Sequence, residues 1–169
     1  MNKACLYYCE GEDDQKLIDA LKVSPGKILP GKSRKLNVIQ TLIPKSILVG
    51  IKPGSNVVLL FDTDVTVNLE ILKKNIENIK KYCQGVKLIY LLQVRNLEDE
   101  LIRCTDVSSV LELTKSKSLS NFKADFRKMK ETECRHSLEH HKIDTELLWE
   151  TPASDEFSFI ERNSKLIKQ

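Results

Sequence analysis

The stretch Asn56–Asp64, NVVLLFDTD, places two aspartates directly after a run of five apolar residues. A continuous apolar run of this length, bounded by the turn signal Lys52–Ser55, is typical of a strand buried on both faces of a sheet. Asp62 and Asp64 are therefore predicted to follow a buried strand, where a carboxylate needs a specific reason to be present.

Two similar apolar runs lie on either side of this strand along the chain. ACLYYC (4–9) precedes it and VKLIYLLQV (86–94) follows it, and each leads to an acid, Glu10 and Glu98 respectively. Strands of this kind, separated by helical patterns, predict an α/β fold with a mostly parallel, Rossmann-like sheet and right-handed crossovers.

Helical periodicity accounts for most of the remaining chain. Helices are expected over 10–22, 36–48 (disturbed at Pro44), 67–82 and 96–104, with a loop marked by Pro25, Gly26, Pro30 and Gly31. Residues 106–169 are predicted to form a mainly helical C-terminal extension, packed on a domain that covers 1–105.

The acids at the three strand ends suggest a shared site. In parallel α/β sheets the loops at the carboxyl ends of the strands gather together and form the binding site. Glu10, Asp62, Asp64 and Glu98 would then repel one another, and a divalent cation between them would relieve that repulsion.

Composition indicates an ordinary globular protein. The chain has 169 residues, of which 41% are hydrophobic and 30% charged, and its formal charge of +3 neither requires nor excludes a nucleic-acid partner. No apolar stretch is long enough for a transmembrane segment, and the N-terminus turns acidic before a signal-peptide core could form. Five cysteines without a CxxC pair predict reduced thiols and a cytoplasmic protein.

The sequence CEGEDD (9–14) followed by FDTDV (61–65) resembles the Toprim domain of topoisomerases, bacterial primases and several nucleases. The shared pattern is an apolar strand ending in Glu-Gly, an acid three residues after the glycine, and a later strand ending in Asp-x-Asp. The match covers roughly residues 4–100. The small size of the chain, with NLEDEL (96–101) and NFKADF (121–126), is most similar to the OLD-type and RloB-like nuclease branch.

The resemblance implies a role for each matching residue. Glu10 would be a general acid/base or a ligand of a first metal, Asp62 and Asp64 would hold Mg²⁺ (with Mn²⁺ able to substitute), and Glu98 would complete a second metal site. Lys123 would lie near the scissile phosphate. Gly11 would let the backbone turn sharply beside the metal.

The implied activity is Mg²⁺-dependent hydrolysis of phosphodiester bonds in DNA or RNA. Relatives of this kind often act beside an ATPase in defence against phage or plasmids, so a separate ATPase subunit is an expected partner, and no membrane partner is expected. Lys32, Arg34 and Lys35 form a basic patch that could contact phosphate or simply keep a loop solvated.

Simpler interpretations stand beside these. Asp14 could serve only the start of its helix, and two of Glu98, Asp99 and Glu100 are expected to be surface or capping acids. His136 and His140 are four residues apart on a predicted helix, a spacing that can bind zinc, although a solvated helix face is the better interpretation.

Three alternatives concern the function itself. GKILPGKS (26–33) satisfies the P-loop pattern but follows a predicted helix end rather than a strand. DTDVT (62–66) resembles the motif of haloacid-dehalogenase phosphatases, in which the first aspartate is the nucleophile. A non-catalytic regulatory or nucleic-acid-binding subunit with the same fold is the third alternative.

Overall fold

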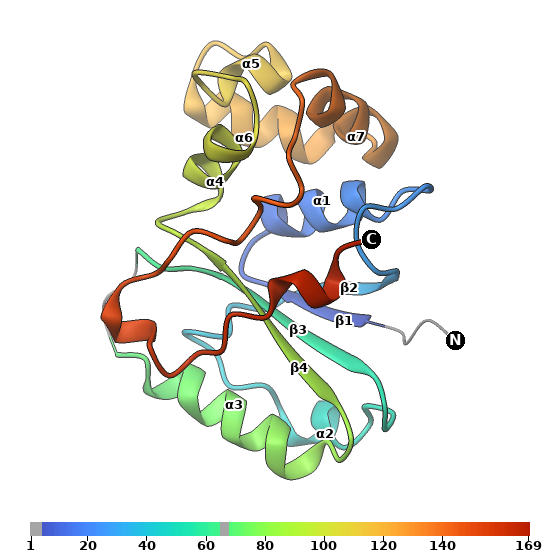
Figure 1. Cartoon of the computed structure of the whole chain (residues 1–169), viewed down its shortest axis with the longest axis vertical. Helices are drawn as coiled ribbons and strands as arrows, with labels where there is room; N and C mark the ends of the chain where they lie inside the picture. Colours follow the sequence, from blue (N-terminus) through green and yellow to red (C-terminus); the bar gives the residue numbers. More distant parts are fainter. Residues whose placement is uncertain (1–4, 65–67) are drawn as a thin grey trace.

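A four-stranded, all-parallel sheet forms the centre of the protein in the computed structural model, which describes residues 5–64 and 68–169 (Figure 1). Its strands are β1 (Cys5–Cys9), β2 (Gly31–Lys35), β3 (Asn56–Asp62) and β4 (Lys87–Gln93), in the order β2-β1-β3-β4. The predicted α/β class and the three predicted strands are confirmed. The start of the helix expected at Val67 lies outside the described residues.

Helices cover both faces of the sheet, as Figure 1 shows. One face carries α1 (Glu12–Leu21) together with α4 (Leu97–Cys104), α5 (Leu111–Thr114), α6 (Leu119–Lys128) and α7 (Glu131–His140). The other face carries α2 (Lys45–Leu48) and α3 (Glu70–Tyr82). Because side chains alternate along a strand, Tyr7 packs with α1 while Tyr8 packs with α2 and α3.

Sequence patterns do not predict the edge strand β2, because its sequence GKSRK has no pattern of apolar side chains and Gly31 belongs to the Pro and Gly signals of a loop. Backbone pairing forms the strand instead: Gly31 to Lys35 align in parallel with Cys5 to Cys9. Gly31 approaches β1 so closely that a Cβ atom there would lie 2.1 Å from the carbonyl oxygen of Cys5.

The helix expected over 36–48 is wrong except for its last turn, Lys45–Leu48. Side-chain amides organise the preceding segment as turns. Asn37 Oδ1 accepts the backbone N–H groups of Ile39 and Gln40, while the buried Asn75 donates to the carbonyls of Val38 and Thr41. These bonds compete with the helical ladder, as Asn side chains commonly do.

After α7 the chain returns to the sheet. This C-terminal segment, drawn in orange and red in Figure 1, crosses β4. Two short 3₁₀ turns, Asp155–Phe157 and Ser164–Ile167, interrupt this C-terminal segment. Asn163 satisfies the free edge of β4, since it accepts the Tyr90 N–H (2.9 Å) and donates to the Leu88 carbonyl (3.0 Å). The C-terminal segment therefore covers an edge that would otherwise expose unpaired backbone groups.

All five cysteines are buried and none forms a disulfide. Among the residues with a described structure, no helix combines the length and the apolarity needed to cross a bilayer.

Candidate active site at the carboxyl edge of the sheet

Five acids meet where β1, β3 and β4 end. Glu10 follows β1, and Asp14 lies in the first turn of α1. Asp62 is the last residue of β3, and Asp64 comes two residues later. Glu98 lies in the first turn of α4. The charges of the other four all act on Asp62 and raise its pKa. We call these five residues the acidic edge. Their convergence is the arrangement that the parallel sheet predicts.

Asp62 has the most perturbed carboxyl group of the acidic edge. Burial is the main cause and the neighbouring acids add to it, so that its pKa rises from the ordinary 3.8 to about 9. At neutral pH this carboxyl therefore holds its proton unless a positive charge comes close.

Glu10 is held in place by two donors. Its Oε1 accepts from the Asn37 side chain at 3.0 Å, and its Oε2 accepts the backbone N–H of Asp62 at 2.9 Å. Burial raises the pKa of Glu10, while these two hydrogen bonds act in the opposite direction. Glu10 thus links the end of β1 directly to the end of β3.

Asp14 serves the start of its helix and also belongs to the acidic edge. Its Oδ2 accepts the Gly11 N–H at 2.7 Å, and burial raises its pKa to about 6. The chain bends at Gly11 between β1 and α1, as expected, but the extended backbone there (φ −128°, ψ 179°) is open to any residue, so the bend does not require a glycine. A Cβ atom at Gly11 would lie 3.3 Å from Asp14 Oδ2, so the glycine leaves room for this carboxylate.

Gln93, the last residue of β4, bridges two of the acids. With its amide nitrogen turned toward them, it donates to Asp14 Oδ1 at 3.0 Å and to Asp62 Oδ1 at 2.6 Å. Neither Gln93 nor Asn37 is among the site residues that the sequence patterns predict. The position of Gln93 at the end of a predicted strand was the one signal that could have identified it.

Backbone pairing between β3 and β4 continues past both strands and fixes the position of Asp64. The Thr63 N–H donates to the Gln93 carbonyl at 3.0 Å, and the Asp64 N–H donates to the Arg95 carbonyl at 3.1 Å. Asp64 is therefore anchored through its backbone at the same edge as Asp62.

Lys123 of α6 reaches the acidic edge from the helical extension. Its Nζ lies 2.9 Å from Glu98 Oε1, and this hydrogen bond raises the pKa of Lys123. The two acids that follow Glu98 along the chain have other partners. Asp99 Oδ2 lies 3.6 Å from the Arg95 guanidinium, and the fully buried Glu100 accepts the backbone N–H of Trp149 at 2.6 Å.

Further cations line the outer side of the acidic edge. Arg127, one turn after Lys123 on α6, makes a two-pronged contact with Asp13 at 2.7 and 2.9 Å. Lys35, at the end of β2, pairs with Glu12 at 2.9 Å. Both acids precede Asp14 at the start of α1, so two ion pairs lie beside the acidic edge.

The remaining two members of the predicted basic patch lie elsewhere. Lys32 and Arg34 pair in register with Leu6 and Tyr8, which face away from α1. Of the patch, only Lys35 is close to the acidic edge.

A preformed metal site is absent from 5–64 and 68–169: no three His, Cys, Asp or Glu side chains there are arranged to hold an ion. The donor chemistry nevertheless suits Mg²⁺, which prefers carboxylate oxygens. In this structure the carboxyl oxygens accept hydrogen bonds instead. Glu10 accepts from the Asn37 amide and from the backbone N–H of Asp62, and Asp62 accepts from the Gln93 amide.

Two other sequence motifs do not form the sites that their patterns suggest. Gly31 to Ser33 of the P-loop-like segment belong to strand β2, and the Ser33 hydroxyl donates to Asp19 at 2.7 Å, so this segment does not form a phosphate-binding loop. His136 and His140 lie on α7 and belong to no metal-binding group among the described residues.

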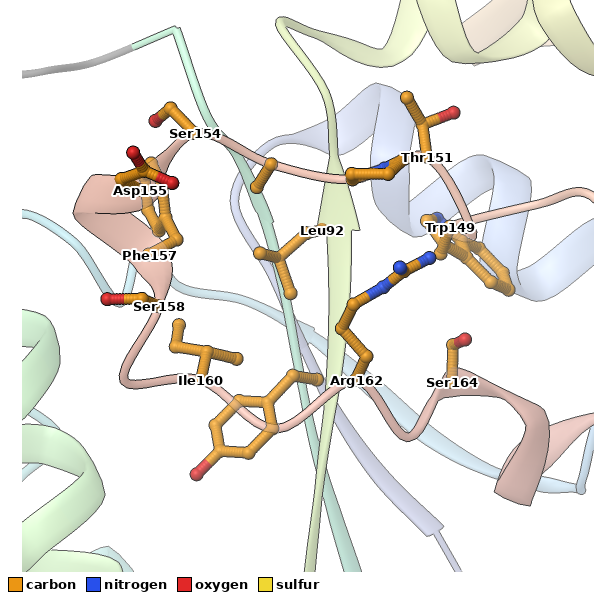
Figure 2. Close-up of a pocket in the computed structure, with 13 residues that line it drawn as sticks. Leu92, Trp149, Thr151, Ser154, Asp155, Phe157, Ser158, Ile160, Arg162 and Ser164 are labelled. Atoms are coloured by element: carbon orange, nitrogen blue, oxygen red, sulfur yellow. The ribbon is translucent and has the colours of Figure 1, made fainter.

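A separate cavity of about 250 Å³ lies between β4 and the C-terminal segment (Figure 2). Leu92 and Ile160 form its apolar floor, and Arg162 extends toward Trp149. The indole Nε1 of Trp149 is buried and has no hydrogen-bond partner among the described residues. None of the acidic-edge residues lines this cavity, so it is distinct from the candidate active site.

No family model, curated protein or solved structure matches this chain.

Proposed function

We propose that the protein is a Mg²⁺-dependent nuclease that hydrolyses phosphodiester bonds in DNA or RNA. The observation that supports this most directly is the contact between the ends of β1 and β3, where Glu10 accepts the Asp62 N–H beside three further acids. Such a group of carboxylates at the carboxyl edge of a parallel sheet is a suitable site for hard cations and for the phosphate oxygens that they bind.

In this proposal Glu10, Asp62 and Asp64 hold the Mg²⁺, and Glu98 contributes to a second ion. Bound Mg²⁺ would neutralise the carboxylates and stabilise negative charge on the phosphate during its hydrolysis. The amides of Asn37 and Gln93 donate to oxygens that would face the ion, so contacts to Mg²⁺ would replace those hydrogen bonds.

The protein's own groups have three tasks in the reaction. Asp62 must release its proton before it can act as an anionic ligand, since its pKa is raised to about 9. Glu10 takes or gives the proton that moves as the bond breaks. Lys123 turns from Glu98 to a phosphate oxygen of the substrate and positions it.

The phosphatase alternative is less favoured by the position of its motif. Asp62 ends β3, the third strand of the chain, whereas the haloacid-dehalogenase motif normally follows the first strand. A separate ATPase partner, a cytoplasmic location and a role in defence against phage or plasmids remain predictions of the Toprim resemblance.

The test is cleavage of plasmid DNA, single-stranded DNA and structured RNA in Mg²⁺ or Mn²⁺, compared with EDTA. We expect metal-dependent cutting that Glu10→Gln and Asp62→Asn abolish and that Glu77→Gln, an exposed acid on α3, leaves intact. Turnover of small phosphomonoesters without cleavage of polymers would favour the phosphatase. Absence of both activities in well-folded protein would favour a non-catalytic subunit.

A further inference from the structure

A basic groove lies apart from the acidic edge, beside the amino-terminal ends of β1 and β2. It has a volume of about 490 Å³. Lys32 and Arg34 of β2 line one side, and the segment that follows α2 lines the other. A volume of this size falls within the range of pockets that hold small ligands, roughly 300–1,000 Å³.

The charge of this groove is entirely positive. Lys32, Arg34 and Lys52 all line it, and no aspartate or glutamate among the described residues does. These three cations make no ion pair with any residue in 5–64 or 68–169. Elsewhere on the same strand, Lys35 does have a partner, Glu12. Three uncompensated cations repel one another, and a bound anion would remove that repulsion.

The backbone sets the spacing of these cations. Lys32 and Arg34 lie two residues apart on one face of β2, a separation of about 6.6 Å along the strand. Leu6, Ile47 and Ile51 add an apolar wall to the groove. The groove thus combines separate cationic contacts with a surface suited to the non-polar part of a ligand.

The hydroxyl group of Tyr8 is a further polar group on the Arg34 side of the sheet. Tyr8 shares its face of the sheet with Leu6 and Arg34, and its OH is buried without a hydrogen-bond partner among the described residues. Tyr8 and Arg34 are paired in the register of β1 and β2; burial raises the pKa of Tyr8, and the positive charge of Arg34 lowers it.

We propose that this groove binds a small organic phosphate of the size of a nucleoside mono- or diphosphate. Lys32, Arg34 and Lys52 would contact the phosphate oxygens, and the aliphatic wall would contact the organic part. Lys32 belongs to the P-loop-like segment, but here it lies on a β-strand rather than at the start of a helix that follows a phosphate-binding loop. The site is independent of the acidic edge and of any nuclease activity.

The test is calorimetric titration of the intact protein with ADP, inorganic phosphate and adenosine, all in EDTA. We expect ADP to bind most tightly and adenosine not to bind. Lys32→Ala, Arg34→Ala and Lys52→Ala should each weaken ADP binding roughly three- to tenfold, the value of one or two charge-assisted contacts at an exposed site. Lys74→Ala, which removes an exposed cation on α3, and Asp62→Asn should leave ADP binding unchanged.

Two outcomes would overturn the inference. One is ADP affinity that is the same in the three groove variants and in Lys74→Ala, with melting temperatures showing that all of them fold. The other is displacement of ADP by single-stranded oligonucleotides whose affinity rises with length, which would make the groove a track for a polymer. The ADP titrations are made in EDTA, without the Mg²⁺ that the proposed nuclease requires. Failure of this site and failure of the proposed nuclease activity are therefore observed in separate experiments.

Discussion

The side-chain amide of Gln93 lies between two carboxyl groups, 3.0 Å from Asp14 Oδ1 and 2.6 Å from Asp62 Oδ1. Gln93 is fully buried at the end of β4, whereas Asp14 and Asp62 come from α1 and β3. One neutral donor thus joins three elements of the acidic edge and satisfies oxygens that water reaches poorly.

Gln93→Leu should destabilise the protein at neutral pH. The change removes the Gln93 donor from Oδ1 of the buried Asp14 and from Oδ1 of the half-buried Asp62, at a cost of about 1–3 kcal/mol in the free energy of unfolding. Urea denaturation at pH 7 measures this cost. Gln40→Leu, at an exposed position, is the matched control, and equal stability of the two variants would contradict the bridging role.

Asp62→Asn should stabilise the protein increasingly as pH rises. The folded state holds the Asp62 proton more tightly than the unfolded chain, because the pKa rises from 3.8 to about 9 on folding. The contribution of this carboxyl to stability is therefore complete below about pH 4 and declines steadily up to about pH 9. The difference in melting temperature between variant and wild type should be smallest at pH 4 and at least about 3 °C at pH 8. A constant difference across this range would show that Asp62 titrates normally.

Lys123→Ala should reduce cleavage with little effect on folding. Lys123 contacts Glu98 at a partly exposed position, so its loss costs about 1 kcal/mol of stability at most. Loss of a cation at the phosphate should lower the rate roughly 10- to 100-fold. Lys128→Ala removes an exposed cation from the same helix and should cleave as the wild type does. Equal rates for the two variants would remove Lys123 from the active site.

Gly31→Ala should disrupt the edge of the sheet. The added Cβ atom would lie 2.1 Å from the Cys5 carbonyl oxygen, a backbone atom that cannot move without separating β1 from β2. We expect a loss of more than about 2 kcal/mol in unfolding free energy. Gly50→Ala has its nearest neighbour at 3.5 Å and should change stability little. Unfolding curves that coincide for the two variants would contradict the close approach of Gly31.

Sequence patterns predicted the central strands because the apolar runs that form β1, β3 and β4 are buried on both faces. They did not predict β2, whose polar residues occupy an exposed edge and whose pairing with β1 is a tertiary interaction. The segment 36–44 has a helical pattern of apolar residues, yet the side chain of Asn37, which accepts the Ile39 N–H, and the distant Asn75, which donates to the Val38 carbonyl, hold it in turns.

The acidic edge followed from one topological rule, that parallel strands bring their carboxyl ends together. The rule placed Glu10, Asp62 and Glu98. It did not identify Asn37, which lies in a turn after β2, or Gln93, whose one signal is its position near the end of a predicted strand. Nor could it orient β2, where alternation of side chains turns Lys32 and Arg34 away from the acids and leaves Lys35 beside them.

Proton release on Mg²⁺ binding tests most directly whether the acidic edge acts as one metal site. Because Asp62 is protonated at pH 7, binding of Mg²⁺ should displace about one proton, measurable by titration calorimetry in buffers of different ionisation enthalpy. We predict this release in the wild type and its loss in Asp62→Asn. Undetectable Mg²⁺ binding, or equal proton release by wild type and Asp62→Asn, would contradict a metal site built on Asp62.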